Sequence, residues 1–212
     1  MDCCQCQGIE IEFNRKTAAK ELGRYRKKGL AKTTRMLIEA LKAEGVRGMT
    51  LLDIGGGVGA VQHELLRAGV NSATNVDAST SYLEAARQEA ERQGCADRVI
   101  FRHGDFVELA PDIAPADVVT LDRVICCYHD MQALVGLSSA RARHYYGLVY
   151  PRDTWWIKPG FAIMNLVLRI WRNQFRIFLH SSEAVDGVVR YHGLERRFYA
   201  RTALWQVVVY SR

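Results

Sequence analysis

A glycine-rich turn in the first third of the chain carries the clearest chemical signal. Asp53 stands at the end of a short apolar run, and just beyond it come the glycines Gly55, Gly56, Gly57 and Gly59. Glycine lets the backbone turn with a positive φ and approach a ligand with no side chain in between. A helix that begins after such a turn also offers unpaired N–H groups. The segment therefore predicts a ligand cradle made of backbone.

The spacing of these glycines excludes two common nucleotide-binding loops. Gly55, Gly57 and Gly59 form the pattern G-x-G-x-G, whereas the dinucleotide fingerprint G-x-G-x-x-G needs a glycine at the position of Ala60. No Gly-Lys-Ser/Thr sequence follows the turn, so the phosphate-binding loop of P-loop enzymes is absent as well. A nicotinamide-dependent oxidoreductase is thereby disfavoured, and it is kept as an alternative together with a non-catalytic cofactor-binding protein.

Further acids follow the next two predicted strands. Asp77 lies 22 residues after Gly55, where a carboxylate can accept hydrogen bonds from both hydroxyl groups of a ribose. Asp105 and Phe106 follow the third strand, where the carboxylate could accept from an adenine amino group and the ring could lie against the base. Because ligands of open α/β sheets bind beyond the carboxyl ends of the strands, we expect Asp53, Asp77 and Asp105 to meet in one crevice.

Short apolar segments alternate with helical segments from residue 49 onward. Strands are predicted at 50–54, 73–76, 99–102, 118–121, 145–149, 197–200 and 204–210. Helices are predicted between the first five strands, at 60–67, 81–93, 105–109 and 131–143. This alternation predicts an α/β fold, a doubly wound and mostly parallel seven-stranded sheet. The last two strands lie so close in sequence that they must form a C-terminal antiparallel hairpin.

The most apolar stretch of the chain lies between the fifth and sixth strands. Residues 161–171 predict a helix, for which we prefer packing on the sheet and keep a peripheral contact with a membrane surface as the alternative. The stretch is too short and too interrupted by polar residues to predict a transmembrane segment. Ser181 or Ser182 can cap a further helix before the final hairpin.

The region before the sheet is basic and helical. Asn14 can cap a helix that ends near Gly29, and a second helix is predicted over 32–44. Between residues 14 and 47 the chain has 11 basic and 3 acidic residues. Residues 48–140 carry a net charge of −7 and residues 141–212 one of +8, so we expect an anionic partner to meet the two basic regions.

Composition limits the class of protein. A chain of 212 residues with 49% hydrophobic and 25% charged residues suits one domain, or one domain with an added arm, and excludes a disordered or disulfide-stapled protein. An acidic, polar start and six cysteines predict a reducing, cytoplasmic location. The cluster of Cys3, Cys4 and Cys6 has no further ligand at zinc-finger spacing, so we expect free thiols and predict no metal site.

With these motifs the chain resembles the class I S-adenosylmethionine-dependent methyltransferases over residues 48–212, and residues 1–47 form a separate basic helical arm. Asp53 to Gly59 look like the family's first motif, Asp77 like its ribose acid, and Asp105 with Phe106 like its adenine-contacting pair. The resemblance implies S-adenosyl-L-methionine as cofactor, with Asp53 and the glycines at its methionine end. It also implies that residues 122–128 face the methyl group. Ala78 and Asp122 complete the expected cofactor-binding set.

A narrower resemblance links the chain to the magnesium-protoporphyrin O-methyltransferase branch. It rests on Arg24-Tyr25, Leu121 to Tyr128, Leu179-His180 with Glu183, and Arg197-Phe198-Tyr199. That branch has a histidine directly before the tyrosine that aligns with Tyr128, where this chain has Cys127. We therefore do not assign the methyl acceptor of that branch to this chain.

The predicted reaction is methylation of a small, acidic or aromatic molecule, most simply at oxygen. The sulfonium is an activated leaving group, so the protein mainly has to hold the acceptor in line, about 3 Å from the methyl carbon. A phenol or hydroxyl acceptor would want a base, for which Tyr128 or His129 is best placed, and Tyr25 could reach over the pocket from the arm. The expected apolar walls are Tyr25, Trp155, Trp156 and Phe161.

Nucleic acid is the disfavoured acceptor. The segment after the fourth strand lacks the Asn/Asp-Pro-Pro-Tyr/Phe string of enzymes that methylate amino groups of nucleic-acid bases. An RNA- or other nucleic-acid-directed methyltransferase stays an alternative because it would explain the basic regions equally well.

Overall fold

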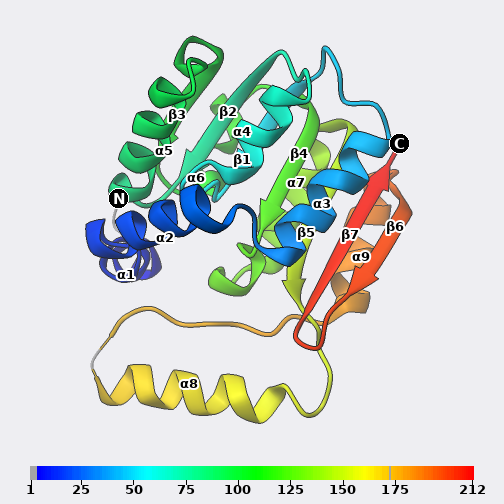
Figure 1. Ribbon diagram of the computed structural model, residues 1–212. Helices are drawn as coiled ribbons and strands as arrows, with labels where there is room; N and C mark the ends of the chain where they lie inside the picture. The colour runs from blue at the N-terminus through cyan, green and yellow to red at the C-terminus, as the bar shows by residue number, and fades with distance from the viewer. Residues whose placement is uncertain (1–3, 172) are drawn as a thin grey trace.

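A seven-stranded sheet forms the centre of the computed structural model, which describes residues 4–171 and 173–212 (Figure 1). The strand order is β3-β2-β1-β4-β5-β7-β6. Strands β1 to β5 run parallel, and β7 is antiparallel to both of its neighbours. The strands are β1 (Thr50–Ile54), β2 (Ser72–Asp77), β3 (Val99–His103), β4 (Ala116–Asp122), β5 (Ala142–Pro151), β6 (Glu195–Arg201) and β7 (Trp205–Ser211). The predicted fold class is confirmed.

Helices cover both faces of this sheet. The α-helices are α1 (Cys4–Glu12), α2 (Arg15–Lys28), α3 (Lys32–Ala43), α4 (Ala60–Arg67), α5 (Thr80–Arg92), α6 (Phe106–Leu109), α7 (Met131–Ala140), α8 (Lys158–Ile170) and α9 (Ser182–Tyr191). Apolar residues of α3, α4 and α5 share one buried cluster with the strands, and those of α6, α7 and α9 share the other. The sheet is therefore the middle layer of a three-layer molecule.

The central strands are apolar on both sides because both of their faces are covered. Leu51 belongs to one buried cluster and Leu52 to the other, and Val118 and Val119 of β4 divide in the same way. Successive side chains of a strand point to opposite faces, so a strand buried on both faces reads as a continuous apolar run. This explains why the strand positions could be predicted closely from the sequence.

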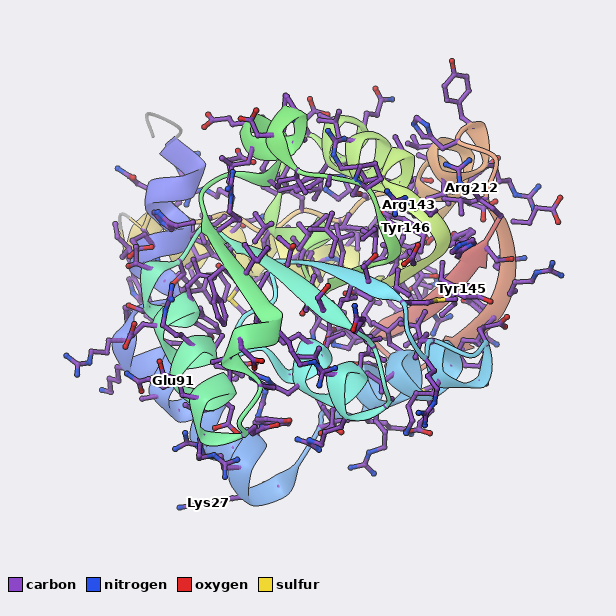
Figure 2. All side chains as sticks on the ribbon, turned by 90° about the horizontal axis from the view of Figure 1, so that it is seen from above. Lys27, Glu91, Arg143, Tyr145, Tyr146 and Arg212 are labelled. Atoms are coloured by element: carbon purple, nitrogen blue, oxygen red, sulfur yellow. The ribbon has the colours of Figure 1, made fainter. Side chains whose placement is uncertain are left out.

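The predicted arm helices form, and the second one enters the core. Asn14 caps α2 by accepting hydrogen bonds from the backbone N–H groups of Lys16 and Thr17 at 3.0 and 3.3 Å. In α3, Leu37 is fully buried against the sheet. A Cβ at Gly147 of β5 would lie 2.7 Å from Leu37 Cδ1, so glycine allows this close approach. Tyr146 beside it fills the interior, whereas Lys27 of α2 projects into solvent (Figure 2).

Helix α1 was not predicted. Its sequence, CQCQGIEIE, lacks the apolar spacing of three and four residues that marks an amphipathic helix. The helix forms where the chain packs against a distant segment, since a Cβ at Gly8 would lie 2.7 Å from the backbone nitrogen of Phe175. Cys3 lies outside the described residues, and the side chains of Cys4 and Cys6 are not described, so the predicted free thiols are not tested.

The preferred placement of the apolar helix on the sheet is wrong. Helix α8 runs along the lower side of the molecule, away from the sheet (Figure 1). Leu168 is its buried residue, and Ile163, Leu166 and Ile170 are exposed. The cause is tertiary, because the faces of the sheet are already occupied by α3, α4 and α5 on one side and by α7 and α9 on the other.

Within the described residues, no helix combines the length and the apolar character needed to cross a bilayer.

Candidate active site

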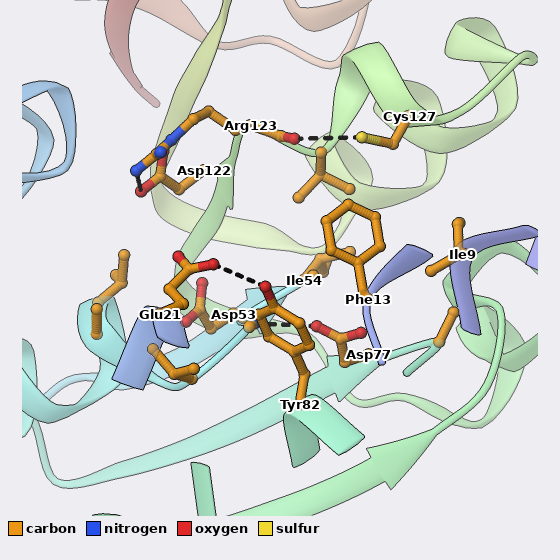
Figure 3. Close-up of a pocket in the computed structure, with 18 of the residues that line it drawn as sticks. Ile9, Phe13, Glu21, Asp53, Ile54, Asp77, Tyr82, Asp122, Arg123 and Cys127 are labelled. Atoms are coloured by element: carbon orange, nitrogen blue, oxygen red, sulfur yellow. Dashed lines mark hydrogen bonds and ion pairs between the residues drawn. The ribbon is translucent and has the colours of Figure 1, made fainter. Parts of the chain in front are cut away.

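A cavity of about 410 Å³ opens beyond the carboxyl ends of the parallel strands (Figure 3). Asp53 and Ile54 of β1, Asp77 of β2 and Asp122 of β4 line it. In the sheet order, β1 lies between β2 and β4, so the chain changes direction across the sheet at this point. Such a switch point is where open α/β sheets bind their ligands. The convergence of acids predicted from the sequence is present.

The glycine turn forms one wall of the cavity. Gly55 and Gly57 have φ values of 61° and 56°, a region that favours glycine over residues with a side chain. A Cβ at Gly55 would lie 2.4 Å from Cγ2 of Val124. Helix α4 begins directly after the turn. Backbone N–H groups are therefore brought close to the cavity, as expected of a ligand cradle.

One predicted glycine serves the packing behind the cavity instead. Gly59 is the N-cap of α4 and does not line the cavity. A Cβ there would lie 2.6 Å from Nε2 of Gln62 and 2.7 Å from Nε2 of His63. The absence of a side chain at Gly59 thus allows these two buried residues to fold back under the turn.

Asp77 joins the turn to β2. Its Oδ2 atom accepts a hydrogen bond from the Gly57 N–H at 2.9 Å, and its Oδ1 atom accepts one from the Ser79 N–H at 2.8 Å. Burial raises the pKa of Asp77 to about 6, against the effect of these two hydrogen bonds. A carboxylate has about four acceptor positions, so capacity is left for ribose hydroxyl groups.

Asp53 is the most deeply buried acid of the cavity wall. Its Oδ1 atom accepts a hydrogen bond from Thr120 Oγ1 at 2.7 Å, and its Oδ2 atom has no hydrogen-bond partner among the described residues. Burial raises the pKa of Asp53 to about 7. A buried acceptor atom without a partner is costly to the folded protein. The position therefore suits a ligand that brings a cationic donor, such as an ammonium group.

Asp105 and Tyr128 meet at the third strand end. The Tyr128 hydroxyl donates a hydrogen bond of 2.8 Å to Asp105 Oδ2, while Asp105 Oδ1 accepts from the Val107 N–H at 2.8 Å and caps α6. Phe106 and Ala78 also line the cavity. The sequence placed these residues at one site, and the structure adds the link between Asp105 and Tyr128.

The fourth strand ends in an unusual backbone conformation. Arg123 has a φ of 65°, the one positive value at a non-glycine residue in the described chain. Its Nε atom donates to Asp122 Oδ1 at 3.1 Å, and its Nη2 atom donates to Thr34 Oγ1 at 2.8 Å. Thr34 in turn donates to Asp122 Oδ2 at 2.5 Å. Strained backbone of this kind collects at functional sites, where surrounding contacts hold it in place.

The three predicted catalytic side chains occupy different surroundings. Tyr128 lines the cavity, whereas His129 does not and stacks on Tyr128 with 5.3 Å between ring centroids. Tyr25 lines the cavity as well, but its hydroxyl donates to Glu64 Oε1 at 3.1 Å and accepts from Arg67 Nη2 at 3.0 Å. The Tyr25 ring is therefore a wall of the site, and its hydroxyl group is engaged by α4.

The other predicted apolar walls are wrong. Trp155 is 81% exposed, Trp156 is exposed and Phe161 is half-buried, and none of them lines the cavity. The wall is formed instead by residues of two other segments, namely Ile9, Phe13, Phe175 and Ile177. Phe13 and Phe175 meet edge to face with 5.5 Å between ring centroids. No sequence pattern links residues so far apart, and only the fold brings them together.

Comparison with known proteins supports the assignment that these residues suggest. Residues 51–143 match the family model described as a methyltransferase domain. Magnesium protoporphyrin IX methyltransferase from Synechocystis PCC 6803, solved with bound S-adenosylmethionine, aligns with a TM-score of 0.70. It is 15% identical, and the alignment covers 98% of this chain and 97% of that one. An O-methyltransferase family protein from Burkholderia thailandensis aligns with a TM-score of 0.64 at 20% identity, over 84% of this chain and 56% of that one.

Among curated proteins, a ribosomal protein L11 methyltransferase from Enterobacter sp. (strain 638) is 32% identical over 92 residues. The match covers 43% of this chain and 30% of that protein. Across the curated relatives found, matching segments cover between 30% and 41% of the relative, so the chain spans less than half the length of these proteins. At identities below 25%, the likeness to the solved structures shows the fold alone.

The described residues fit the cofactor of this class of enzymes. Asp53 offers a buried carboxylate oxygen with no partner in the described chain, and Asp77 presents a carboxylate at the end of β2. The glycine turn between them leaves backbone without side chains at the cavity wall. Residues 51–143 match the methyltransferase domain model, and the chain as a whole shares the fold of class I methyltransferases that were solved with bound S-adenosylmethionine or S-adenosylhomocysteine.

Proposed function

We propose that the protein transfers a methyl group from S-adenosylmethionine to a small, anionic or aromatic acceptor, by O-methylation. The observation that carries the proposal is the single cavity that joins the glycine turn to an apolar region lined by Phe13, Phe175 and Ile177. Its volume of about 410 Å³ falls within the range of about 300–1,000 Å³ that is usual for small-molecule sites. Arg24 and Arg123 also line it and offer positive charge to an anionic acceptor.

In this proposal the strand ends hold the cofactor. Asp53 and the glycine turn receive its amino acid end, Asp77 its ribose, and Asp105 with Phe106 its base; Ala78 and Asp122 complete the wall. When bound, the cofactor supplies a methyl group on a sulfonium that is already an activated leaving group. The protein then has to place the acceptor in line and exclude water.

Tyr128 is the residue we assign to the acceptor end. A carboxylate acceptor needs no base, and for it the Tyr128 hydroxyl would orient the attacking oxygen. For a phenol acceptor, the link from Tyr128 to Asp105 gives a proton a route from the acceptor to a carboxylate. His129 supports this arrangement by stacking on the Tyr128 ring, and the Tyr25 ring closes the side of the cavity.

The test separates binding from turnover. Calorimetric titration with S-adenosylhomocysteine should give a clear heat with the unaltered protein and a Kd raised at least about tenfold in Asp77→Ala, because two backbone N–H groups lose their acceptor. Incubation with labelled S-adenosylmethionine and a panel of carboxylate and phenol acceptors should then give a methyl ester or ether. Absence of binding would refute the cofactor site, and binding without turnover on any acceptor would leave a non-catalytic cofactor-binding protein.

A protein acceptor is the second candidate. It is favoured by the curated relatives, which are ribosomal protein L11 methyltransferases. Labelled methyl groups that appear in ribosomal protein and not in small acceptors would support a protein acceptor. Labelling of RNA would support the nucleic-acid alternative.

A further inference from the structure

Helix α8 exposes a broad apolar face. At about 100° per residue, Ile163, Leu166 and Ile170 fall on one side of the helix, with Met164 and Trp171 beside them. All five side chains are exposed, and Ile170 is 67% exposed. Isolated exposed apolar residues are ordinary, but a contiguous patch of this kind marks an interaction surface. We call these five residues the α8 face.

Tryptophans stand at both ends of this helix. Trp155 and Trp156 precede it, Trp171 follows it directly, and all three are exposed. Indole rings have an apolar body and one polar N–H group, so they favour the boundary between hydrocarbon and water. Their positions at the two ends suit a helix that lies flat in such a boundary.

The charged side chains of α8 itself are basic. Lys158 and Arg169 are exposed and lie 11 residues apart, on the same side of the helix, next to the apolar face. Between Lys158 and Ile170 the chain has no aspartate or glutamate. Long basic side chains can lie along an apolar surface and hold their charge at its edge. An apolar face bordered by cations is complementary to a surface of anionic lipid.

The helix is also tied to the wall of the cavity. The Asn165 side chain donates to the Ile177 carbonyl at 2.7 Å and accepts from the Ile177 N–H at 3.0 Å. The next residue, Phe178, donates its N–H to the Cys126 carbonyl at 2.7 Å. Ile177 and Cys126 both line the cavity. The helix therefore has a fixed attachment to the body, and its apolar face remains available.

We propose that the α8 face docks on the surface of an anionic lipid bilayer as an interfacial helix. The proposal does not depend on the identity of the methyl acceptor. The long apolar side chains enter the boundary of the hydrocarbon layer, and Lys158 and Arg169 meet the lipid headgroups. The cavity wall at Ile177 then lies next to the bound surface.

Sedimentation with lipid vesicles tests the docking. The full chain should sediment with vesicles of phosphatidylcholine and phosphatidylglycerol, and its tryptophan emission should shift to shorter wavelength. Added salt should release the protein because it screens the attraction. Failure to bind these vesicles would overturn the proposal, and equal binding to vesicles of phosphatidylcholine alone would overturn the role of charge.

Matched variants locate the surface. Ile170→Glu should lower the partition coefficient at least about tenfold, because a carboxylate replaces an apolar side chain in the boundary layer. Ile100→Glu is the control, since Ile100 lies on β3 and is 61% exposed, close to the 67% of Ile170. The control should bind as the unaltered protein does. Equal loss in both variants would contradict the assignment to α8.

A second pair of variants tests the cations. Lys158→Glu with Arg169→Glu should weaken binding to anionic vesicles at least about tenfold, since each basic residue near the surface contributes about fivefold. Lys27→Glu with Lys28→Glu in α2 makes the same change of charge at exposed positions of another helix and should have a small effect. If sedimentation velocity instead shows a dimer that Ile170→Glu dissociates, the face belongs to a second copy of the chain and the proposal is wrong.

Discussion

The hydroxyl of Tyr82 donates a hydrogen bond of 2.7 Å to Glu21 Oε2 and so joins α5 to the arm helix α2 at the edge of the cavity (Figure 3). Both residues line the cavity, and Tyr82 is buried. The Tyr82 ring also lies against the glycine turn, since a Cβ at Gly57 would be 3.3 Å from its Cδ1 atom. The Tyr82 side chain therefore contacts the arm helix α2 and the glycine turn at the same time.

Removal of this hydroxyl should loosen the arm. We expect Tyr82→Phe to lower the free energy of unfolding by about 1 kcal/mol, because a part-buried hydrogen bond to a carboxylate is lost. The Kd for S-adenosylhomocysteine should rise several-fold, since the arm helix forms part of the cavity wall. Urea unfolding and calorimetry measure the two effects. Tyr191→Phe, at a tyrosine that is 86% exposed, is the control and should change neither quantity.

Ligand binding should depend on pH through Asp53. Burial raises the pKa of Asp53 to about 7, so the group is largely protonated below that pH in the free protein. An ammonium group on the ligand favours the ionised carboxylate. The Kd for S-adenosylhomocysteine should therefore fall as the pH rises through 7. Calorimetry between pH 5.5 and 8.5, values chosen to span about 1.5 units on each side of that pKa, measures it.

Asp53 should also make the folded protein less stable as the pH rises. The folded protein keeps a proton on Asp53 up to about pH 7, whereas the unfolded chain loses it near its ordinary pKa of 3.8. Between these values the folded state binds more protons, so the free energy of unfolding decreases as pH rises, by at most about 1.4 kcal/mol per pH unit. Asp53→Asn cannot ionise and should show a shallower decrease. An identical pH profile in the two proteins would contradict a raised pKa at Asp53.

Glu89 should have the opposite effect: in the acid range the folded protein should become less stable as the pH falls. Burial alone would raise its pKa, but hydrogen bonds from Arg92, Gln93 and Arg26 outweigh burial and lower the pKa to about 2. The stabilisation is therefore present above about pH 4.5 and is lost as the pH falls toward 2. Glu89→Gln should lower the free energy of unfolding at pH 7 by about 1–3 kcal/mol and by less at pH 3, since the neutral amide no longer attracts the arginines.

Glu91→Gln is the control for Glu89→Gln. Glu91 lies on the same helix, is exposed and faces solvent (Figure 2). Urea unfolding of Glu91→Gln should match that of the unaltered protein at both pH values. A similar loss in the two variants would show that the helix responds to charge in general and not to the contacts of Glu89.

Cys127 should react slowly with alkylating agents. A hydrogen bond with Cys126, whose sulfur lies 3.9 Å away, and burial raise the pKa of the Cys127 thiol well above its ordinary value. Because the thiolate is the nucleophile, iodoacetamide at pH 8 should modify Cys127 far more slowly in the folded protein than in urea. Mass spectrometry of the peptide that contains Cys127 measures both rates. S-Adenosylhomocysteine should slow the folded reaction further, since Cys127 lines the cavity. Equal rates with and without this compound would argue against binding beside Cys127.

Local signals in the sequence predicted the strands and most of the helices, but not α1, and they predicted the glycine turn and the acids that line the cavity. Asn14 and Gly29 mark the two ends of α2. The glycines after Asp53 mark a turn that requires a positive φ at Gly55 and Gly57. Such features depend on residues that are near one another in the chain. The acids at the strand ends could be placed together because parallel strands bring their carboxyl ends to one edge of a sheet.

Only the tertiary structure decided which partner, protein or solvent, each face of a helix and each side chain of the site contacts. The helical period of α8 is visible in the sequence, but its direction away from the sheet follows from helices that already occupy both faces. The Tyr25 hydroxyl is engaged by Glu64 and Arg67, and Phe13 meets Phe175, through contacts between distant segments. Periodicity fixes which residues share a side of an element, and the surface that covers that side depends on long-range packing that no local pattern encodes.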